Sequence, residues 1–171
     1  MKNNIPDMDL GRTAIFAGIP ENKLAKISAI VKLKDYAVNC IVMKEGETGG
    51  SLCILLDGEV EVSKSLVFRS SGATVDPRDK SLIRLSSKTH PFFGEMSLFD
   101  KESVRTATVR AITQCKFAVI DLAEFVKLAE SDHEIGYRTF LNMSWVLSDR
   151  LNRTNNDLLK VTTALGLALE R

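Results

Sequence analysis

Apolar residues between positions 31 and 62 fall into short runs that alternate in part with polar residues. The runs are interrupted by four glycines and contain Val31, Leu33, Ile41, Val42, Leu52, Ile54, Leu56, Val60 and Val62. Alternation with a period of two is typical of strands, and frequent glycine is typical of turns. Short strands joined by glycine turns predict a β-sandwich or a β-roll.

More strands are expected further along the chain. Residues 66–69 and 82–85 read as the two arms of a hairpin, but the segment SSGATVDPRDK between them is polar and longer than a tight hairpin needs. We expect this segment to be a mobile surface excursion. Strands are predicted again at residues 106–112 and 116–120, where the all-β part ends.

Helices are predicted on both sides of the β region. In IFAGIPENKL, at residues 15–24, a Gly-Ile-Pro turn precedes helix-forming residues, so a short helix should begin near Pro20 or Glu21. Asp121 should cap the amphipathic helix DLAEFVKLAES. Ser131 and Glu134 have the spacing of a capping box, and no proline follows them.

The C-terminal segment, residues 132–171, is predicted to form one long helix, or two helices broken near Gly166. Six of its positions alternate in spacing between four and three, as in a heptad seam with two polar members: Leu151, Asn155, Leu158, Thr162, Leu165 and Leu169. A parallel dimer seam and a helix packed on its own β-roll both agree with this pattern.

Composition narrows the class of protein. A chain of 171 residues with 44% hydrophobic and 26% charged residues is expected to fold as one globular domain. Its net charge of +1 gives no bulk attraction to nucleic acid or to an anionic membrane. No apolar run approaches the roughly 20 residues that span a bilayer, and the N-terminus lacks a signal-peptide core, so we expect a cytoplasmic protein.

The cysteines and histidines do not indicate a disulfide framework or a metal site. Cys40, Cys53 and Cys115 are odd in number and have apolar neighbours, which predicts buried thiols in a reducing compartment. His90 and His133 are too few for a metal enzyme of the β-roll type and are expected at the surface. We expect no cofactor, no metal and no catalytic residue.

Arg105 has an unusual position. In RTATVRA it shares its parity with Ala107, Val109 and Ala111, which is the side that a strand would bury. A buried arginine is costly unless it meets an anion. That anion could be Glu95, in a purely structural ion pair, or the phosphate of a ligand, for which a guanidinium offers paired donors.

Ten residues upstream, FGEMSL contains a glycine turn that runs into a short helix. The N–H groups at a helix N-terminus attract anions, and Gly94 would let the backbone approach a ligand closely. Glu95 could accept hydrogen bonds from ligand hydroxyls. The set suits a small ligand that carries a phosphate diester and a sugar hydroxyl, although each piece alone is a weak signal.

Residues 93–111, FGEMSLFDKESVRTATVRA, closely resemble the phosphate-binding cassette of cyclic-nucleotide-binding domains, with the Glu-to-Arg spacing of catabolite-activator-like proteins. IFAGIPENKLAKI and IVMKEGETGGSLCILLDGEVEV resemble other parts of that family, so the resemblance covers about residues 15–160. It implies a mainly β α+β fold: an antiparallel β-roll or jelly roll flanked by short N-terminal helices, a short cassette helix and a long C-terminal helix. The implied division is a tail at 1–14, the binding domain at 15–131 and the helix at 132–171.

The resemblance also implies site residues. Glu95 would bind the ribose 2′-hydroxyl, Arg105 and Thr106 would bind the cyclic phosphate, and the cassette backbone would be lined by Gly94, Met96 and Ser97. In RLNRTNN the resemblance offers Thr154 and Asn155 as contacts to the purine, in an alignment that needs about one extra helical turn. Thr106 agrees with either cAMP or cGMP, and we expect cAMP to be favoured.

The expected function is a stand-alone, ligand-responsive regulatory module, not an enzyme. Its expected partners are the cyclic nucleotide, a second copy through the C-terminal helix and an unidentified effector protein. DNA is not expected as a partner of this chain alone, because no recognition helix or basic patch is visible. The alternatives are a degenerate interaction module that binds no nucleotide and the sensor part of a truncated transcription regulator.

Overall fold

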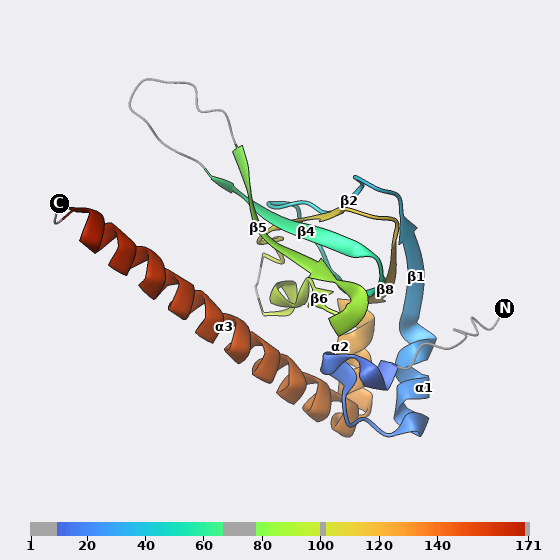
Figure 1. The fold of residues 1–171 in the computed structure, drawn as a ribbon. Helices are drawn as coiled ribbons and strands as arrows, with labels where there is room; N and C mark the ends of the chain where they lie inside the picture. The colour runs from blue at the N-terminus through green and yellow to red at the C-terminus, as the bar shows by residue number, and fades with distance from the viewer. Residues whose placement is uncertain (1–9, 67–77, 100–101, 170–171) are drawn as a thin grey trace.

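The computed structural model describes residues 10–66, 78–99 and 102–169 (Figure 1). In this part of the chain, two four-stranded antiparallel sheets have the strand orders β1-β8-β3-β6 and β2-β7-β4-β5. The strands are β1 Val31–Tyr36, β2 Ile41–Met43, β3 Ser51–Asp57, β4 Glu59–Leu66, β5 Arg78–Ser86, β6 Phe92–Phe93, β7 Thr108–Ala111 and β8 Cys115–Asp121. The predicted jelly-roll class is confirmed.

The β1-β8-β3-β6 sheet is covered on both faces. In β3, Cys53 and Leu55 pack into the apolar layer between the two sheets, whereas Leu52 and Ile54 pack against the helices. All four side chains are therefore buried. A strand that is buried on both faces reads as a continuous apolar run, which explains why the period-two pattern of this segment is only partial.

Helices α1 Glu21–Ile30 and α2 Leu122–Ser131 lie against this sheet with the first part of α3 His133–Leu169 (Figure 1). Short 3₁₀ helices η1 Leu10–Arg12, η2 Ala14–Phe16, η3 Ser87–Thr89 and η4 Glu95–Leu98 complete the described elements. The predicted start of α1 is confirmed. Asp121 caps α2 as predicted, because its Oδ1 accepts a 3.0 Å hydrogen bond from the backbone N–H of Glu124.

The predicted capping box of Ser131 and Glu134 is wrong. Ser131 is the last residue of α2, and its hydroxyl donates to the carbonyl oxygen of Leu128 at 2.8 Å. The chain turns at Asp132, whose non-helical backbone separates α2 from α3. The hydroxyl therefore completes the end of one helix and does not begin the next.

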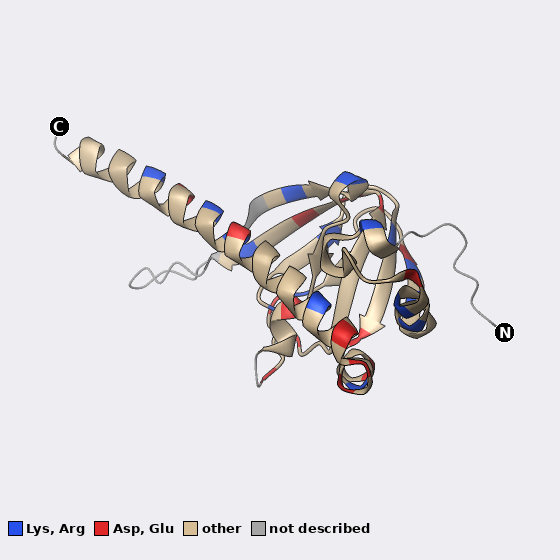
Figure 2. Cartoon of the chain, turned by 90° about the horizontal axis from the view of Figure 1, so that it is seen from below, with Lys and Arg blue, Asp and Glu red and all other residues tan. Residues whose placement is uncertain are grey.

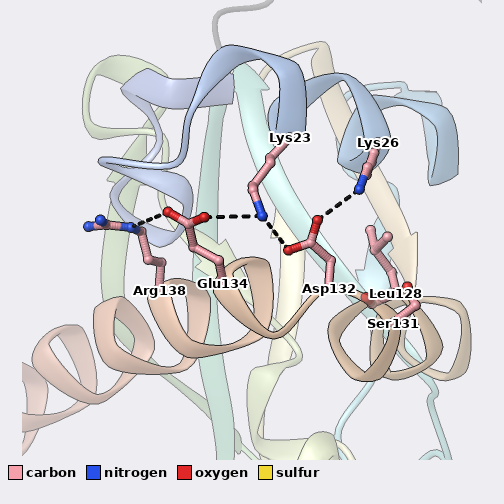
Figure 3. Close-up of polar contacts among 7 residues, drawn as sticks. All are labelled: Lys23, Lys26, Leu128, Ser131, Asp132, Glu134 and Arg138. Carbon is pink, nitrogen blue, oxygen red and sulfur yellow. Dashed lines mark hydrogen bonds and ion pairs between the residues drawn. The ribbon is translucent and has the colours of Figure 1, made fainter.

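An ion-pair network ties α1 to the junction of α2 and α3 (Figure 3). The Asp132 carboxylate accepts hydrogen bonds from Lys23 at 2.6 Å and from Lys26 at 2.8 Å, and Lys23 also pairs with Glu134 at 3.1 Å. The two lysines hold the pKa of Asp132 well below its usual value. The network fixes the point from which α3 departs.

Helix α3 packs on the body only over its first half. Its buried residues are Ile135, Gly136, Thr139 and Met143, and every residue from 151 to 169 is exposed. Both views show the second half leaving the body (Figures 1 and 2). The helix runs through Gly166 without a break, so the alternative of one long helix is correct.

The hairpin predicted around the polar excursion exists, since β4 pairs with β5, but residues 83–85 pair with residues 60–62 and not with the predicted arm at 66–69. Residues 67–77 of the excursion lie outside the described residues, and residues 78–80, predicted as part of it, belong to β5. The strand predicted at 106–112 is shorter, because β7 begins at Thr108. Arg105 and Thr106 therefore precede the strand.

Cys53 and Cys115 are buried as predicted, but Cys40 is exposed, and all three are free thiols. Cys40 follows Asn39, which has a φ of 67°, in the turn between β1 and β2. Its apolar neighbours Val38 and Ile41 are also exposed, at 52% and 45%, so apolar neighbours did not predict burial at this turn.

Surface charge is mixed in sign. Figure 2 shows acidic and basic residues on helices and strands of the body and along α3. Among the described residues, no helix is both long and apolar enough to cross a membrane.

Candidate functional site

The turn between β6 and η4 requires the glycine that the sequence places there. Gly94 has a φ of 87°, and a Cβ atom at this position would collide with the carbonyl oxygen of Ser51 and with Nη1 of Arg105. The turn leads into η4, which buries Glu95 and Ser97, at 4% and 5% exposure, and leaves Met96 exposed. The predicted short helix thus exists and points a carboxylate inward.

Arg105 lies in the loop before β7 and is held there by the turn that follows β2. Its backbone N–H donates to the carbonyl oxygen of Glu47 at 2.9 Å, and its carbonyl oxygen accepts from the N–H of Gly46 at 2.9 Å. The side chain is 7% exposed. The inward direction predicted for Arg105 is observed, but a loop held by backbone hydrogen bonds produces it, not the alternation of a strand.

Among the described residues, the Arg105 guanidinium contacts only neutral oxygens. Nη2 donates to the Ser51 hydroxyl at 2.9 Å, and Nη1 lies 3.4 Å from both the Ser97 hydroxyl and the Gly94 carbonyl oxygen. Within the described part of the chain, no carboxylate lies within 4.0 Å of it. A buried cation with neutral partners is incompletely compensated, and it is ready to bind an anion.

The partner of Glu95 is not Arg105, the residue that the sequence suggested. Its Oε1 accepts a 2.7 Å hydrogen bond from Nη1 of Arg150, in α3, so the structural pair of Glu95 and Arg105 is not formed. Arg150 Nη2 also donates to the Phe92 carbonyl oxygen at 2.9 Å, and its guanidinium lies 4.8 Å from the centre of the Phe92 ring. Arg150 thereby connects α3 to the cassette.

Burial raises the pKa of the Glu95 carboxyl above its ordinary value of 4.5. The positive charge and hydrogen bond of Arg150 oppose this rise, and the charge of Arg105 opposes it more weakly. The ionised form of this buried acid is therefore stabilised by two arginines, Arg150 more strongly than Arg105.

A cavity of about 140 Å³ adjoins Arg105, Glu95 and Arg150. Its lining combines these charged groups with apolar side chains; the other lining residues are Met43, Val62, Phe93, Gly94, Met96, Thr106, Ala107 and Val109. Thr106 is exposed at its rim. The arrangement offers a cation, an acidic acceptor and an apolar wall within one small space.

Thr154 and Asn155 lie apart from this lining. Both are exposed on α3, and the Thr154 hydroxyl donates to the carbonyl oxygen of Arg150 at 3.0 Å. Neither residue lines the described cavity. Their role as contacts to a purine stays a prediction.

Ser51 and Arg150 were not predicted to be site residues. A signal for Arg150 existed, because it continues the buried face of α3 by four residues from Val146, which packs against the core, and seven from the buried Met143. No comparable signal marks Ser51, a single small polar residue between a glycine pair and an apolar run. In the described residues, no group of three metal-binding side chains comes together.

One known protein family matches more than half of this chain. The cyclic nucleotide-binding domain family matches residues 33–132, which include strands β2 to β8, the cassette and α2. The chain belongs to this family. The cyclic nucleotide-binding domain therefore contains Glu95 and Arg105, while Arg150 lies on the helix that follows the matched region.

The chain is also similar to individual proteins. It is 28% identical over 152 residues to the CRP-like cAMP-activated global transcriptional regulator of Mycobacterium tuberculosis, covering 89% of this chain and 61% of that protein. It is 30% identical over 134 residues to the cAMP-activated global transcriptional regulator Vfr of Pseudomonas aeruginosa, covering 77% of this chain and 56% of Vfr. This chain thus spans less than two thirds of either relative.

Among solved structures, the catabolite activator protein of Thermus thermophilus has a similar fold, with a TM-score of 0.70 at 19% identity. The match covers 88% of this chain and 63% of that one. The two chains therefore share the same overall fold.

Proposed function

We propose that this cyclic nucleotide-binding domain binds cAMP in preference to cGMP and acts as a ligand-responsive regulatory module. One observation supports nucleotide binding above all others. The buried Arg105 guanidinium, at the cavity wall, has only neutral oxygen partners among the described residues. A cyclic phosphate diester carries the single negative charge that would compensate it.

The remaining lining fits the rest of a nucleotide. Glu95 offers a carboxylate to a ribose hydroxyl, and the apolar side chains of Met43, Val62 and Val109 suit the face of a base. The preference for cAMP is supported by the names of two relatives, both of which are described as cAMP-activated.

The proposal of a response to ligand rests on Arg150 and on the size of the cavity. A volume of about 140 Å³ is small beside the roughly 300–1,000 Å³ of most ligand pockets. Arg150 lines this space from α3 and donates a hydrogen bond to Glu95, the residue proposed to accept a hydrogen bond from the ribose. A bound nucleotide would therefore move Arg150, and the first half of α3 would change its packing on the cassette.

The second half of α3 supports a homodimer as the form of the regulatory module. Leucines at 151, 158 and 165 take one heptad position, and Asn155, Thr162 and Leu169 take the other, which is a pattern of parallel two-stranded coiled coils. All six side chains are exposed, at about 60% for the leucines at 151, 158 and 165. A second copy would bury this seam. The effector protein, the stand-alone action and the cytoplasmic location stay predictions from the sequence.

Calorimetry with cAMP and with cGMP tests the proposed site. Arg105→Ala removes charge-assisted hydrogen bonds and should weaken binding of the preferred nucleotide roughly tenfold to a hundredfold. Arg110→Ala is the matched control, because Arg110 lies on β7 and donates to the exposed carbonyl oxygen of Asn39. It should bind as the native chain does.

Each result of this titration has a consequence. Binding of neither nucleotide by the native chain would favour a degenerate interaction module. Equal affinity of the native chain and Arg105→Ala would overturn the assignment of the phosphate site. Tighter binding of cGMP than of cAMP would overturn the proposed preference alone.

A further inference from the structure

The Arg105 side chain could rotate within its loop, so something must hold its guanidinium toward the cavity. Its contacts with Gly94 and Ser97 are 3.4 Å long, near the upper limit for a hydrogen bond. The contact between Nη2 and the Ser51 hydroxyl is 2.9 Å, which is the usual length of a strong N–H to O bond. Ser51 therefore supplies the best-formed bond to this cation.

Ser51 is itself held firmly. It is the first residue of β3 and pairs with Asp121 of β8. The preceding Gly50 accepts a 2.8 Å hydrogen bond from the N–H of Leu122. The backbone that carries the Ser51 side chain is therefore fixed in place, so its hydroxyl can orient a partner.

The residues next to Ser51 offer the Arg105 guanidinium no charged partner that would compete with the Ser51 hydroxyl. Cys53, two residues along the same strand, is 3% exposed, and burial raises the pKa of its thiol, which stays neutral near pH 7. Gly49 has no side chain, and a Cβ at that position would occupy the place of the Arg105 Nε and Cζ atoms. The guanidinium thus lies against bare backbone on one side and against the Ser51 hydroxyl at its tip.

We infer that Ser51 is a positioning residue of the phosphate site, which orients the Arg105 guanidinium toward the anion of the ligand without touching the ligand itself. This inference rests on the proposed function. It adds a residue 54 positions upstream of Arg105 and outside the cassette of residues 93–111. The Ser51 hydroxyl accepts one N–H from Nη2 of Arg105. Because the guanidinium is planar, this bond also sets the directions of the N–H groups on Nη1 and Nε.

The test uses three variants of the full chain. Ser51→Thr keeps the hydroxyl, and Ser51→Val has the same shape without it; Ser51→Ala removes the hydroxyl without adding bulk. Calorimetry with cAMP should show Ser51→Ala and Ser51→Val weakened roughly three- to twentyfold, which is less than the direct loss of a hydrogen bond to a charged group, because the guanidinium remains and only its orientation is lost. Ser51→Thr should remain much closer to the native affinity than Ser51→Val.

A second background separates positioning from general damage. Ser51→Ala introduced into Arg105→Ala should cause no further loss, because its effect passes through the missing guanidinium. Equal affinity of native chain and Ser51→Ala would overturn the inference, and so would a full additive loss in the Arg105→Ala background.

A measurement without ligand separates this inference from the proposed function. Nitrogen-15 relaxation of the Arg105 Nε–Hε group should show a rigid side chain in the native protein and in Ser51→Thr, and a more mobile one in Ser51→Ala and Ser51→Val. If the native chain binds no nucleotide, the proposed function fails, and this relaxation still decides whether Ser51 orients Arg105. Unchanged relaxation in all variants would overturn the inference.

Discussion

Arg150 donates a 2.7 Å hydrogen bond to the buried carboxylate of Glu95 across 55 positions of sequence. This single bond links the acidic acceptor of the cassette to the long helix α3. Because its positive charge opposes the rise in the pKa of Glu95 that burial causes, Arg150 also helps to keep the acceptor ionised.

The pH dependence of cAMP binding should report this relationship. Protonation removes the charge from Glu95 and weakens its hydrogen bond to a ribose hydroxyl, so affinity should fall as pH is lowered through the pKa of Glu95. Arg150→Met removes a cause that lowers this pKa, so the fall should begin at a higher pH, and protonation should weaken binding by roughly tenfold in total. Calorimetry between pH 5 and 8 measures both profiles.

Arg153→Met is the control for that experiment. Arg153 lies three residues further along α3, is 75% exposed and pairs with Asp149. Arg153→Met should have the same pH profile of cAMP affinity as the native chain. Coincident profiles of the native chain and Arg150→Met would contradict the electrostatic role of Arg150.

Glu95→Gln should separate stability from binding. The folded-state pKa of Glu95 is raised, so the folded protein holds this proton more tightly than the unfolded chain, and stability falls as pH rises from about 4.5 through the folded pKa. A neutral glutamine avoids this penalty. The variant should therefore unfold at a midpoint temperature equal to or above that of the native chain at pH 8, and any advantage should disappear near pH 4.5.

The same variant should bind cAMP roughly tenfold more weakly, because a charge-assisted hydrogen bond becomes a neutral one. Glu47→Gln, at an exposed glutamate, serves as the control for both measurements and should change neither. A clear loss of stability in Glu95→Gln at pH 8 would contradict this account of the buried carboxyl.

Gly49→Ala should weaken binding while preserving the fold. The added Cβ meets the end of the Arg105 side chain, which can move away, and neither Gly49 nor Gly50 has a left-handed φ. We expect a loss in cAMP affinity of roughly tenfold, comparable to a lost charged hydrogen bond, with an unchanged circular dichroism spectrum.

Gly50→Ala is a closely matched control, since nothing lies within 4 Å of its added Cβ. It should bind as the native chain does. Equal losses in the two alanine variants would mean that the turn itself, and not the guanidinium, is sensitive to substitution.

Leu158→Asp should weaken self-association through the heptad seam. Leu158 is 60% exposed and lies on the seam, whereas Leu167 is 62% exposed and lies two positions after Leu165, on the opposite side of the helix. Sedimentation of Leu158→Asp should show a shift from dimer to monomer, with Leu167→Asp remaining dimeric. A monomeric native chain, or equal effects of both substitutions, would exclude the seam as the dimer interface.

Much of the fold could be predicted because local patterns encode it. The glycine-punctuated strands, the Asp121 cap and the glycine turn before Glu95 each depend on residues within a few positions of one another. The errors have local causes as well. Cys40 is exposed because it follows Asn39, whose backbone is left-handed, in a turn. Ser131 does not cap α3, because it ends α2 and the chain turns at Asp132.

Sequence by itself determined the glycine-punctuated strands, because strand period and turn chemistry carry that information, and its resemblance to a known family gave the jelly-roll class and the cassette. It also predicted that Arg105 points inward, although a loop held by backbone hydrogen bonds, and not strand alternation, produces that direction. Only the tertiary structure decided which groups meet: Ser51 with Arg105, and Arg150 with Glu95. These partners lie more than 50 positions apart, and their meeting depends on how two sheets and a long helix pack together. No local period records that packing, so the partners of the two charged groups, and the link to α3 that they create, became visible only in the fold.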